Sequence, residues 1–278
     1  MSPYRTVLPP DPAAAAEQLA ETVTGGGTPL VISGGTLAVP ALQRGELTPT
    51  VLVDLHRAGL DTVVLHDGYV EIGATVTYQR ILDSPALAER VPLLHRVAGG
   101  ITGGIQIRNQ ATVAGALCAA RPQSDAPATA VALGARVVVR SVRGTRIVPV
   151  EEFLTGAGRT DLAADELVEA VRIPVGPAPR RCGYAKLKFA ESSWPVVTAA
   201  ALATAAPGAT VVLGGVAVTP LRLPPTPPDR IGDVVADRLA RLPPEQHWSD
   251  LRAGWAYRRS VAPTLAARAL AAVAEEHP

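Results

Sequence analysis

Residues 99–125, GGITGGIQIRNQATVAGALCAARPQSD, combine glycines, an Arg-Asn pair and an acid within an otherwise apolar chain. Backbone N–H groups left bare in glycine-rich turns bind phosphate oxygens. Five glycines of this segment can take a positive φ or bring the bare main chain close to a ligand: Gly99, Gly100, Gly103, Gly104 and Gly115. The segment therefore predicts a loop that holds an anion.

A second, smaller glycine turn lies upstream. Residues 29–37, PLVISGGTL, form a β-branched apolar run that ends in Gly34-Gly35-Thr36. Such a run is typical of a buried strand that delivers its C-terminal turn to a ligand. Two turns of this kind predict two contacts with one elongated anion.

The elements around the first turn read as a small βαβ-like unit. Asp11-Pro12 is a helix start, because the acid can cap free N–H groups and proline suits the first turn. We expect a helix over 13–23, ended by glycines, and strands at 29–33 and 51–55. Residues 62–74 then predict a hairpin around Asp67-Gly68.

Helices and strands alternate further along the chain. Residues 78–100 carry apolar positions at helical spacing, broken by Ser84-Pro85. A helix at 126–133 that stops at Gly134 and two strands turning at Arg143-Gly144 follow the glycine segment. The proline-rich stretch 173–183 predicts a boundary, beyond which we expect a strand pair within 209–218 and an Ala-rich helix over 256–275.

Composition limits the classes of function. The 278 residues are 47% apolar, enough for a sizeable core, and 26 Lys and Arg balance 25 Asp and Glu at a net charge of +1. Nucleic acid has little electrostatic reason to bind such a chain. No run approaches the roughly 20 apolar residues of a membrane span, and the N-terminus lacks a signal core. We therefore expect a cytoplasmic protein without a nucleic-acid or membrane partner.

Metal and nucleophile chemistry receive no support from the sequence. Cys118 and Cys182 are the only cysteines and lack CxxC spacing, so we expect two buried apolar side chains rather than zinc or iron–sulfur ligands. The five histidines are scattered singly. No Ser, His and acid combination suggests a catalytic set, so catalytic residues stay unknown.

The two turns resemble the phosphate loops of the FAD-binding medium subunit of molybdenum hydroxylases, most closely the carbon monoxide dehydrogenase medium-chain type and the xanthine dehydrogenase FAD-binding subunits. VISGGTLAVP is similar to that family's first loop, and IQIRNQATVAGAL to its second. The resemblance continues in order through RPQSDAPATAVALGARV, EEFLTGAGRTDLAADELV, YAKLKFAESSWPVVTAAA, LGGVAVTPLRL and SDLRAGWAYRRSVAPTLAARAL. It covers almost the whole chain.

The resemblance implies an α+β fold. Residues 1–175 would form a PCMH-type FAD-binding domain with subdomains at about 1–56 and 57–175, and residues 176–278 a domain of antiparallel sheet and helical bundle. It implies an oxidoreductase subunit whose FAD relays electrons between molybdopterin and iron–sulfur partner subunits and an external acceptor.

The resemblance also implies the cofactor contacts. Asp125 would bond a sugar hydroxyl, Lys186 would lie near the flavin, and Tyr184 would be the aromatic side chain nearest the ring. Ile107 and Asn109 would frame the second loop. The pyrophosphate would lie between two sets of residues: Ser33, Gly34, Gly35, Thr36 and Leu37 from the first turn, and Thr112, Ala114, Gly115 and Ala116 from the second.

The sequence departs from the family at these turns. Leu37 replaces a second polar residue, and Ala114-Gly115-Ala116 replaces Gly-Gly-Asn or Gly-Gly-Asp. A lost polar contact weakens binding by about 0.5–1.5 kcal/mol, and an alanine forced to positive φ would add roughly 1 kcal/mol. We expect FAD affinity to fall by about one to a few powers of ten. The alternative is a stand-alone relative that works as a cyclase, an isomerase or a small-molecule-binding protein.

Overall fold

The computed structural model describes residues 4–177, 180–203 and 209–275. Its N-terminal unit is the expected βαβ arrangement, a parallel sheet in the order β1-β3-β2 with one long helix. The Asp11 carboxylate caps that helix by accepting a hydrogen bond from the Ala14 N–H at 2.8 Å. The elements are β1 (Arg5–Val7), α1 (Pro12–Thr24), β2 (Pro29–Ile32), α2 (Ala38–Gln43), β3 (Val51–Asp54) and η1 (Leu55–Arg57).

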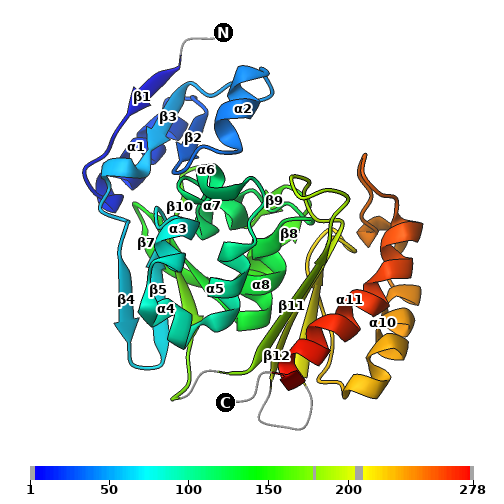
Figure 1. Ribbon diagram of the computed structural model, residues 1–278. Helices are drawn as coiled ribbons and strands as arrows, with labels where there is room; N and C mark the ends of the chain where they lie inside the picture. The colour runs from blue at the N-terminus through cyan, green and yellow to red at the C-terminus, as the bar shows by residue number, and fades with distance from the viewer. Residues whose placement is uncertain (1–3, 178–179, 204–208, 276–278) are drawn as a thin grey trace.

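A five-stranded antiparallel sheet forms the centre of the molecule (Figure 1). Both predicted hairpins are present, but Ser141 pairs with Gly144, so the second hairpin turns at Val142-Arg143, one residue earlier than expected. In the order β4-β5-β10-β6-β7, the strands are Val63–His66, Tyr69–Gly73, Leu167–Pro174, Arg136–Ser141 and Gly144–Pro149.

Short helices lie against this sheet, and local sequence sets their ends. Thr77 and Ser84 cap two of them with their hydroxyls, and prolines occupy the first turns after Ser84 and Val91. Gly134, at φ +67°, ends a helix in which every residue is buried. The helices are α3 (Tyr78–Leu82), α4 (Pro85–Arg90), α5 (Pro92–Gly99), α6 (Gly104–Arg108), α7 (Val113–Cys118) and α8 (Asp125–Leu133).

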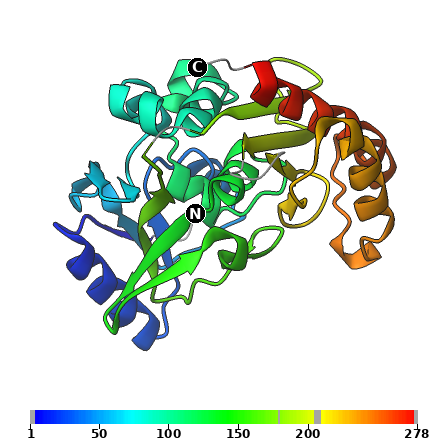
Figure 2. The ribbon, with the colours of Figure 1, turned by 90° about the horizontal axis from the view of Figure 1, so that it is seen from below.

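A four-stranded antiparallel sheet and two helices form the C-terminal part. The predicted strand pair within 209–218 is wrong, because a single strand runs from Ala209 to Gly214 and the chain turns at Gly215, where φ is +77°. Figures 1 and 2 place both helices on the face of the sheet away from the N-terminal unit. The elements are β11 (Cys182–Leu187), β12 (Val197–Ala203), β13 (Ala209–Gly214), β14 (Leu221–Arg222), α10 (Ile231–Ala240) and α11 (Trp255–Glu275).

Small elements join the two large sheets to their neighbours. They are α9 (Val150–Phe153), β8 (Leu154–Gly156), β9 (Arg159–Thr160), η2 (Pro228–Arg230) and η3 (Pro244–Gln246). None of the helices in the described part of the chain is both long and apolar enough to cross a membrane.

The C-terminal sheet separates two hydrophobic cores. Alternating residues of β12 face opposite sides, so Ala200 and Leu202 join the core around the central sheet while Ala199 and Ala201 join the core under α11. Cys182 is buried in the first core as expected, whereas Cys118 is only partly buried. The domain boundary at residue 175 stays a prediction.

A fully buried arginine ties the second core together. Arg258 donates to the carbonyl oxygens of Gly215 at 2.9 Å, Ala253 at 3.0 Å and Val196, and to the Asp250 carboxylate at 2.7 Å. Burial lowers the pKa of this guanidinium, and Asp250 opposes that effect.

Candidate functional site

The first glycine turn, residues 33–37, leaves the carboxyl end of β2 and enters α2. A Cβ atom on Gly34 would lie 1.8 Å from the backbone oxygen of Gln110, so the absence of a side chain lets this turn lie directly against the second one. Gly35 has φ +65°. Among the described residues, the N–H groups of Gly34 to Leu37 donate no hydrogen bond. The turn therefore presents a run of free backbone donors.

The side chains of this turn contribute little polar chemistry. The Ser33 hydroxyl donates to the carbonyl oxygen of Ala74 at 3.4 Å, and Thr36 is partly exposed. Leu37 lies at the start of α2 and makes no capping hydrogen bond through its side chain. The polar groups that this turn offers to a ligand are therefore mainly those of the main chain.

The second turn is held in place by the elements around it. Gly103 and Gly104 take φ values of +97° and +67°, and Ile107 packs closely over Gly103, where a Cβ atom would lie 2.3 Å from its side chain. Asn109 ends α6 and is exposed. The Tyr78 N–H donates to the Ala111 carbonyl at 3.0 Å, which anchors the turn to α3. Ile107 therefore packs within the second turn, and its role in framing a cofactor stays a prediction.

Thr112 begins α7, and this corrects two expectations. Its hydroxyl accepts a hydrogen bond from the Gly115 N–H at 3.0 Å, so Gly115 does not offer a free donor. The N–H groups of Val113 and Ala114 are the ones without a partner among the described residues. Ala114 lies inside the helix without a positive φ, so the expected strain at this alanine is absent.

The glycines of the two turns differ in their φ angles. Gly35, Gly103 and Gly104 have positive φ, whereas Gly99, Gly100 and Gly115 do not. Ala116 is partly exposed on α7. The one non-glycine residue with positive φ in the described ranges is Ala120, at 44°, between α7 and α8.

A buried polar cluster lies farther along the same segment. Lys186 Nζ lies 2.7 Å from Asp125 Oδ1, and the Tyr184 hydroxyl donates to that oxygen at 2.6 Å. The Lys186 ammonium also donates to the Gly100 carbonyl at 2.5 Å. The Asp125 and Lys186 side chains are only 5% and 15% exposed. The structure therefore joins α8, β11 and the glycine segment through one carboxylate.

Two phenols border this cluster and keep their protons. Burial raises the pKa of Tyr78 and of Tyr184 well above the ordinary value, and the Asp125 charge raises both further. Tyr184 therefore acts as a hydrogen-bond donor to Asp125. Sequence reasoning named Asp125, Lys186 and Tyr184 separately but missed that they bond one another.

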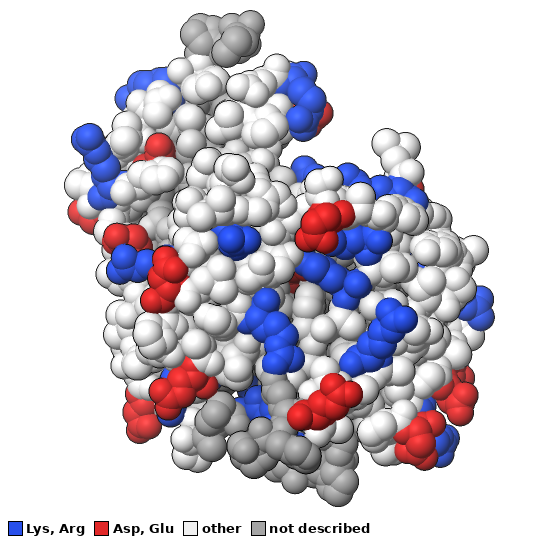
Figure 3. Space-filling model, in the orientation of Figure 1, with Lys and Arg blue, Asp and Glu red and all other residues white. Residues whose placement is uncertain are grey.

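The second turn and the polar cluster belong to one chain segment, since Lys186 bonds Gly100 at its start and Asp125 at its end. Figure 1 shows α6 and α7 at the junction of the N-terminal unit and the central sheet, with the segment leading on to α8. Figure 3 shows a notch on this side of the molecule, between the N-terminal and C-terminal units, with Lys and Arg side chains along its floor. No group of three His, Cys, Asp or Glu side chains suited to a metal ion occurs in the described ranges.

These residues fit an FAD molecule. Two turns with free N–H groups meet where Gly34 has no side chain, which suits a pyrophosphate. The Thr112 hydroxyl accepts one hydrogen bond and keeps its own proton to donate. A paired carboxylate and ammonium lie further along the segment, where polar sugar and ring atoms would need partners.

The family model described as "FAD binding domain in molybdopterin dehydrogenase" matches residues 4–176, more than half of the chain. The chain belongs to this family. The glyceraldehyde dehydrogenase medium chain of Sulfolobus acidocaldarius is 34% identical over 145 residues, 52% of this chain and 51% of that one. The carbon monoxide dehydrogenase medium chain of Afipia carboxidovorans is 32% identical over 195 residues, 68% of this chain and 67% of that one.

Solved structures of this family extend the likeness to nearly the full chain. A carbon monoxide dehydrogenase from Hydrogenophaga pseudoflava covers 97% of this chain and 96% of its own at 25% identity and a TM-score of 0.88. A Cu,Mo carbon monoxide dehydrogenase covers 99% of both chains at 29% identity and the same TM-score. The expected α+β fold is confirmed. The sequence matches to the first two curated relatives span about half of their length.

Proposed function

We propose that this chain is the FAD-binding subunit of a molybdenum-hydroxylase-type oxidoreductase. In this role it passes electrons between molybdopterin and iron–sulfur subunits and an external acceptor. The proposal rests on the contact between Gly34 and Gln110, which brings together two turns with free backbone N–H groups. The family match and relatives named as medium chains or subunits of dehydrogenases and hydroxylases support it. They do not favour the stand-alone alternative. A cytoplasmic location stays a prediction from the sequence.

The backbone would hold the cofactor's pyrophosphate. Donors from Gly34 to Leu37 bind one side, and the N–H groups of Val113 and Ala114 bind the other. The Thr112 hydroxyl donates its remaining proton to the same phosphates. Contacts of Ser33, Thr36, Leu37, Asn109 and Ala116 with the cofactor stay predictions.

The polar cluster would hold the flavin end. The Lys186 ammonium has three donors, of which Asp125 and Gly100 take two, so one is left for a polar atom of the cofactor. Tyr184 and Asp125 fix the position of that ammonium, whose charge favours negative charge on the bound group. FAD, when bound, supplies the two-electron chemistry that amino-acid side chains lack.

The cofactor part of the proposal is tested at Gly115. This residue is exposed, and a Cβ atom would meet only the Thr112 hydroxyl, at 3.0 Å. Because an acid is favourable in the first turn of a helix, we expect Gly115→Asp to leave the apo fold intact. Its charge beside the phosphates should weaken FAD binding roughly a hundredfold or more, measured by fluorescence titration.

Gly115→Asn is the matched control, since it has the same size without the charge. It should lose far less affinity than Gly115→Asp. Equal affinities of the two variants would show that the pyrophosphate lies elsewhere. A wild-type protein that excess FAD neither colours nor stabilises against heat would overturn the cofactor assignment.

The partner part of the proposal needs a separate test. Tagged protein expressed in its native host should co-purify with a molybdopterin-containing chain and an iron–sulfur chain. Neighbouring genes for such subunits would agree with that result. Purification as a lone chain, with no such genes nearby, would contradict the complex while leaving FAD binding unaffected.

A further inference from the structure

A cavity of about 250 Å³ lies at the other end of α8 from the cofactor residues. Asp125 is the first residue of α8, whereas the cavity adjoins its last residues, Leu133 and Gly134. Nine helical residues span about 13 Å, so the two places are distinct. The lining residues come from α8, β10, the approach to β11, and β12 to β14: Ala132, Leu133, Gly134, Pro174, Arg180, Leu202, Ala203, Thr210 and Arg222.

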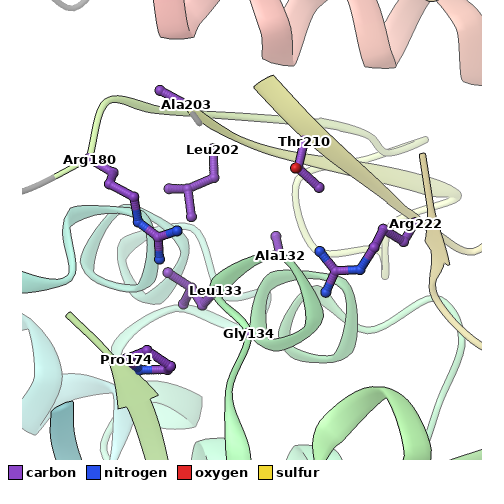
Figure 4. A pocket seen from close by; sticks show the side chains of 9 residues that line it. All are labelled: Ala132, Leu133, Gly134, Pro174, Arg180, Leu202, Ala203, Thr210 and Arg222. Carbon is purple, nitrogen blue, oxygen red and sulfur yellow. The ribbon is translucent and has the colours of Figure 1, made fainter. Parts of the chain in front are cut away.

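Two guanidinium groups reach into this cavity from opposite sides (Figure 4). Arg222 already has partners: its Nε lies 3.0 Å from Glu151 Oε2, and its Nη2 donates to the Val131 carbonyl at 2.6 Å. Arg180 has no hydrogen bond or ion pair with any described residue. Partial burial lowers the pKa of this guanidinium, although the residue as a whole stays exposed.

The described lining contains no Asp or Glu, and Glu151, which lies outside it, pairs with Arg222 and not with Arg180. A smaller hollow next to the cavity shares Leu133, Pro174, Arg180 and Leu202 with it, and Arg90 is among its other lining residues. Arg180 stays exposed overall and has no partner among the described residues, so its guanidinium is free to donate to an anion that enters the cavity.

The C-terminal end of α8 explains the position of Arg222 but not that of Arg180. Carbonyl groups at the C-terminus of a helix attract cations, and Arg222 satisfies one of them at Val131. Arg180 donates to none of the α8 carbonyls among the described hydrogen bonds. Its guanidinium faces a cavity with apolar walls at Leu133 and Leu202.

We propose that this cavity binds a small organic anion. Its carboxylate or phosphate group would lie between Arg180 and Arg222, and its apolar part against Leu133 and Leu202. The shared chemistry of these ligands is a compact anionic oxygen group that can accept from the Arg180 guanidinium and from the remaining N–H groups of Arg222. The cavity volume restricts the ligand to a molecule smaller than a typical cofactor.

The test uses full-length protein saturated with FAD, so that the phosphate cradle is filled. If the protein takes up no FAD, the same titration is done on the apo protein with Gly115→Asp as background. Inorganic phosphate, succinate and benzoate are titrated by calorimetry against chloride at equal ionic strength. We expect saturable binding of at least one, and the ranking distinguishes a phosphate ligand from a carboxylate ligand.

Arg180→Met should weaken that binding about tenfold or more, and Arg180→Lys should recover part of it. Because Arg180 bonds no described residue, the variant should keep the wild-type melting temperature. Arg241→Met is the matched control, since it removes an equally positive, exposed side chain on the C-terminal side of α10. Absence of saturable binding, or equal weakening by Arg180→Met and Arg241→Met, would overturn the proposal.

Discussion

Ala116 stands where the family pattern has Asn or Asp. Among the departures from that pattern, it is the one that a substitution can reverse with the least disturbance of the structure. It is partly exposed on α7, so a larger side chain fits without repacking. We expect Ala116→Asn to strengthen FAD binding by about 0.5–1.5 kcal/mol, roughly two- to tenfold, because it restores a polar contact. Fluorescence titration measures the change.

Ala119→Asn provides the comparison, since Ala119 is partly exposed at the other end of the same helix. It should leave FAD affinity unchanged. If both substitutions alter affinity equally, Ala116 does not face the cofactor, and the family pattern would not apply at this position.

The backbone of the second turn shows what residue types alone do not specify. Glycine content predicted positive φ at several positions, but only Gly103 and Gly104 of that segment adopt it. Thr112 explains this for Gly115, because its hydroxyl starts a helix and draws Ala114 and Gly115 into α7, whereas Gly99 and Gly100 belong to the end of α5. A threonine before an apolar run is a helix-start signal, so this part was predictable.

The sequence predicted the residues of the polar cluster but not the contacts between them. Asp125, Lys186 and Tyr184 belong to segments far apart in the chain, and nothing in their spacing indicates that one carboxylate accepts from both partners. Their pairing follows from the docking of β11 beside α8, which a single sequence does not encode locally.

At the scale of elements, the C-terminal helices depend on Arg258. Replacing it with methionine removes the cation that pairs with Asp250 and takes the guanidinium donor away from the buried carbonyl groups of Gly215 and Val196. We expect Arg258→Met to destabilise the protein by about 3–5 kcal/mol, because uncompensated buried polar groups are costly. Urea unfolding followed by circular dichroism measures this free energy.

Arg259→Met tests the specificity of that effect. Arg259 is the next residue on α11 and is exposed, so its loss should change stability by about 0.5 kcal/mol or less. Similar destabilisation by both substitutions would mean that the buried hydrogen bonds of Arg258 contribute little.

The error in the C-terminal sheet has a physical cause. Residues 209–213 are buried or nearly so on both faces of β13, so their sequence lacks the alternation that marks one strand face. An uninterrupted apolar run gives no indication of where a strand ends. The Gly214-Gly215 pair was the better signal, since Gly215 takes the positive φ of the turn.

At the scale of the whole molecule, carboxylates paired with arginine determine how the fold responds to acid. Arg146 lowers the pKa of Glu166, whose carboxylate also accepts the Ala163 N–H. Burial acts to raise the pKa of Asp250, but backbone N–H groups and Arg258 outweigh it and lower that pKa. A folded pKa below the unfolded one stabilises the fold above the unfolded pKa.

We therefore expect thermal stability to hold near neutral pH and to fall as the pH drops below about 4.5, through the lowered carboxyl pKa values. Glu166→Gln should be less stable than wild type at pH 7, and the difference should close in acid. Differential scanning calorimetry across pH measures both. Glu152→Gln, at an exposed residue, should follow the wild-type curve. A constant gap at every pH would contradict the role of the Glu166 charge.

The overall architecture was the most predictable level. Parallel and antiparallel units followed from strand patterning and turn residues, and the long resemblance specified their order. The cavity beside Arg180 and Arg222 lay beyond prediction, because its walls come from separate segments that meet only in the folded chain.

The contact between Gly34 and Gln110 also constrains how the protein matures. Each half of the phosphate cradle belongs to a different part of the chain, on either side of the β4-β5 hairpin. A nascent chain that exposes only the first half has no complete cradle to load. Flavin incorporation must then follow synthesis and docking of the second half, so bound flavin would report a correctly assembled molecule.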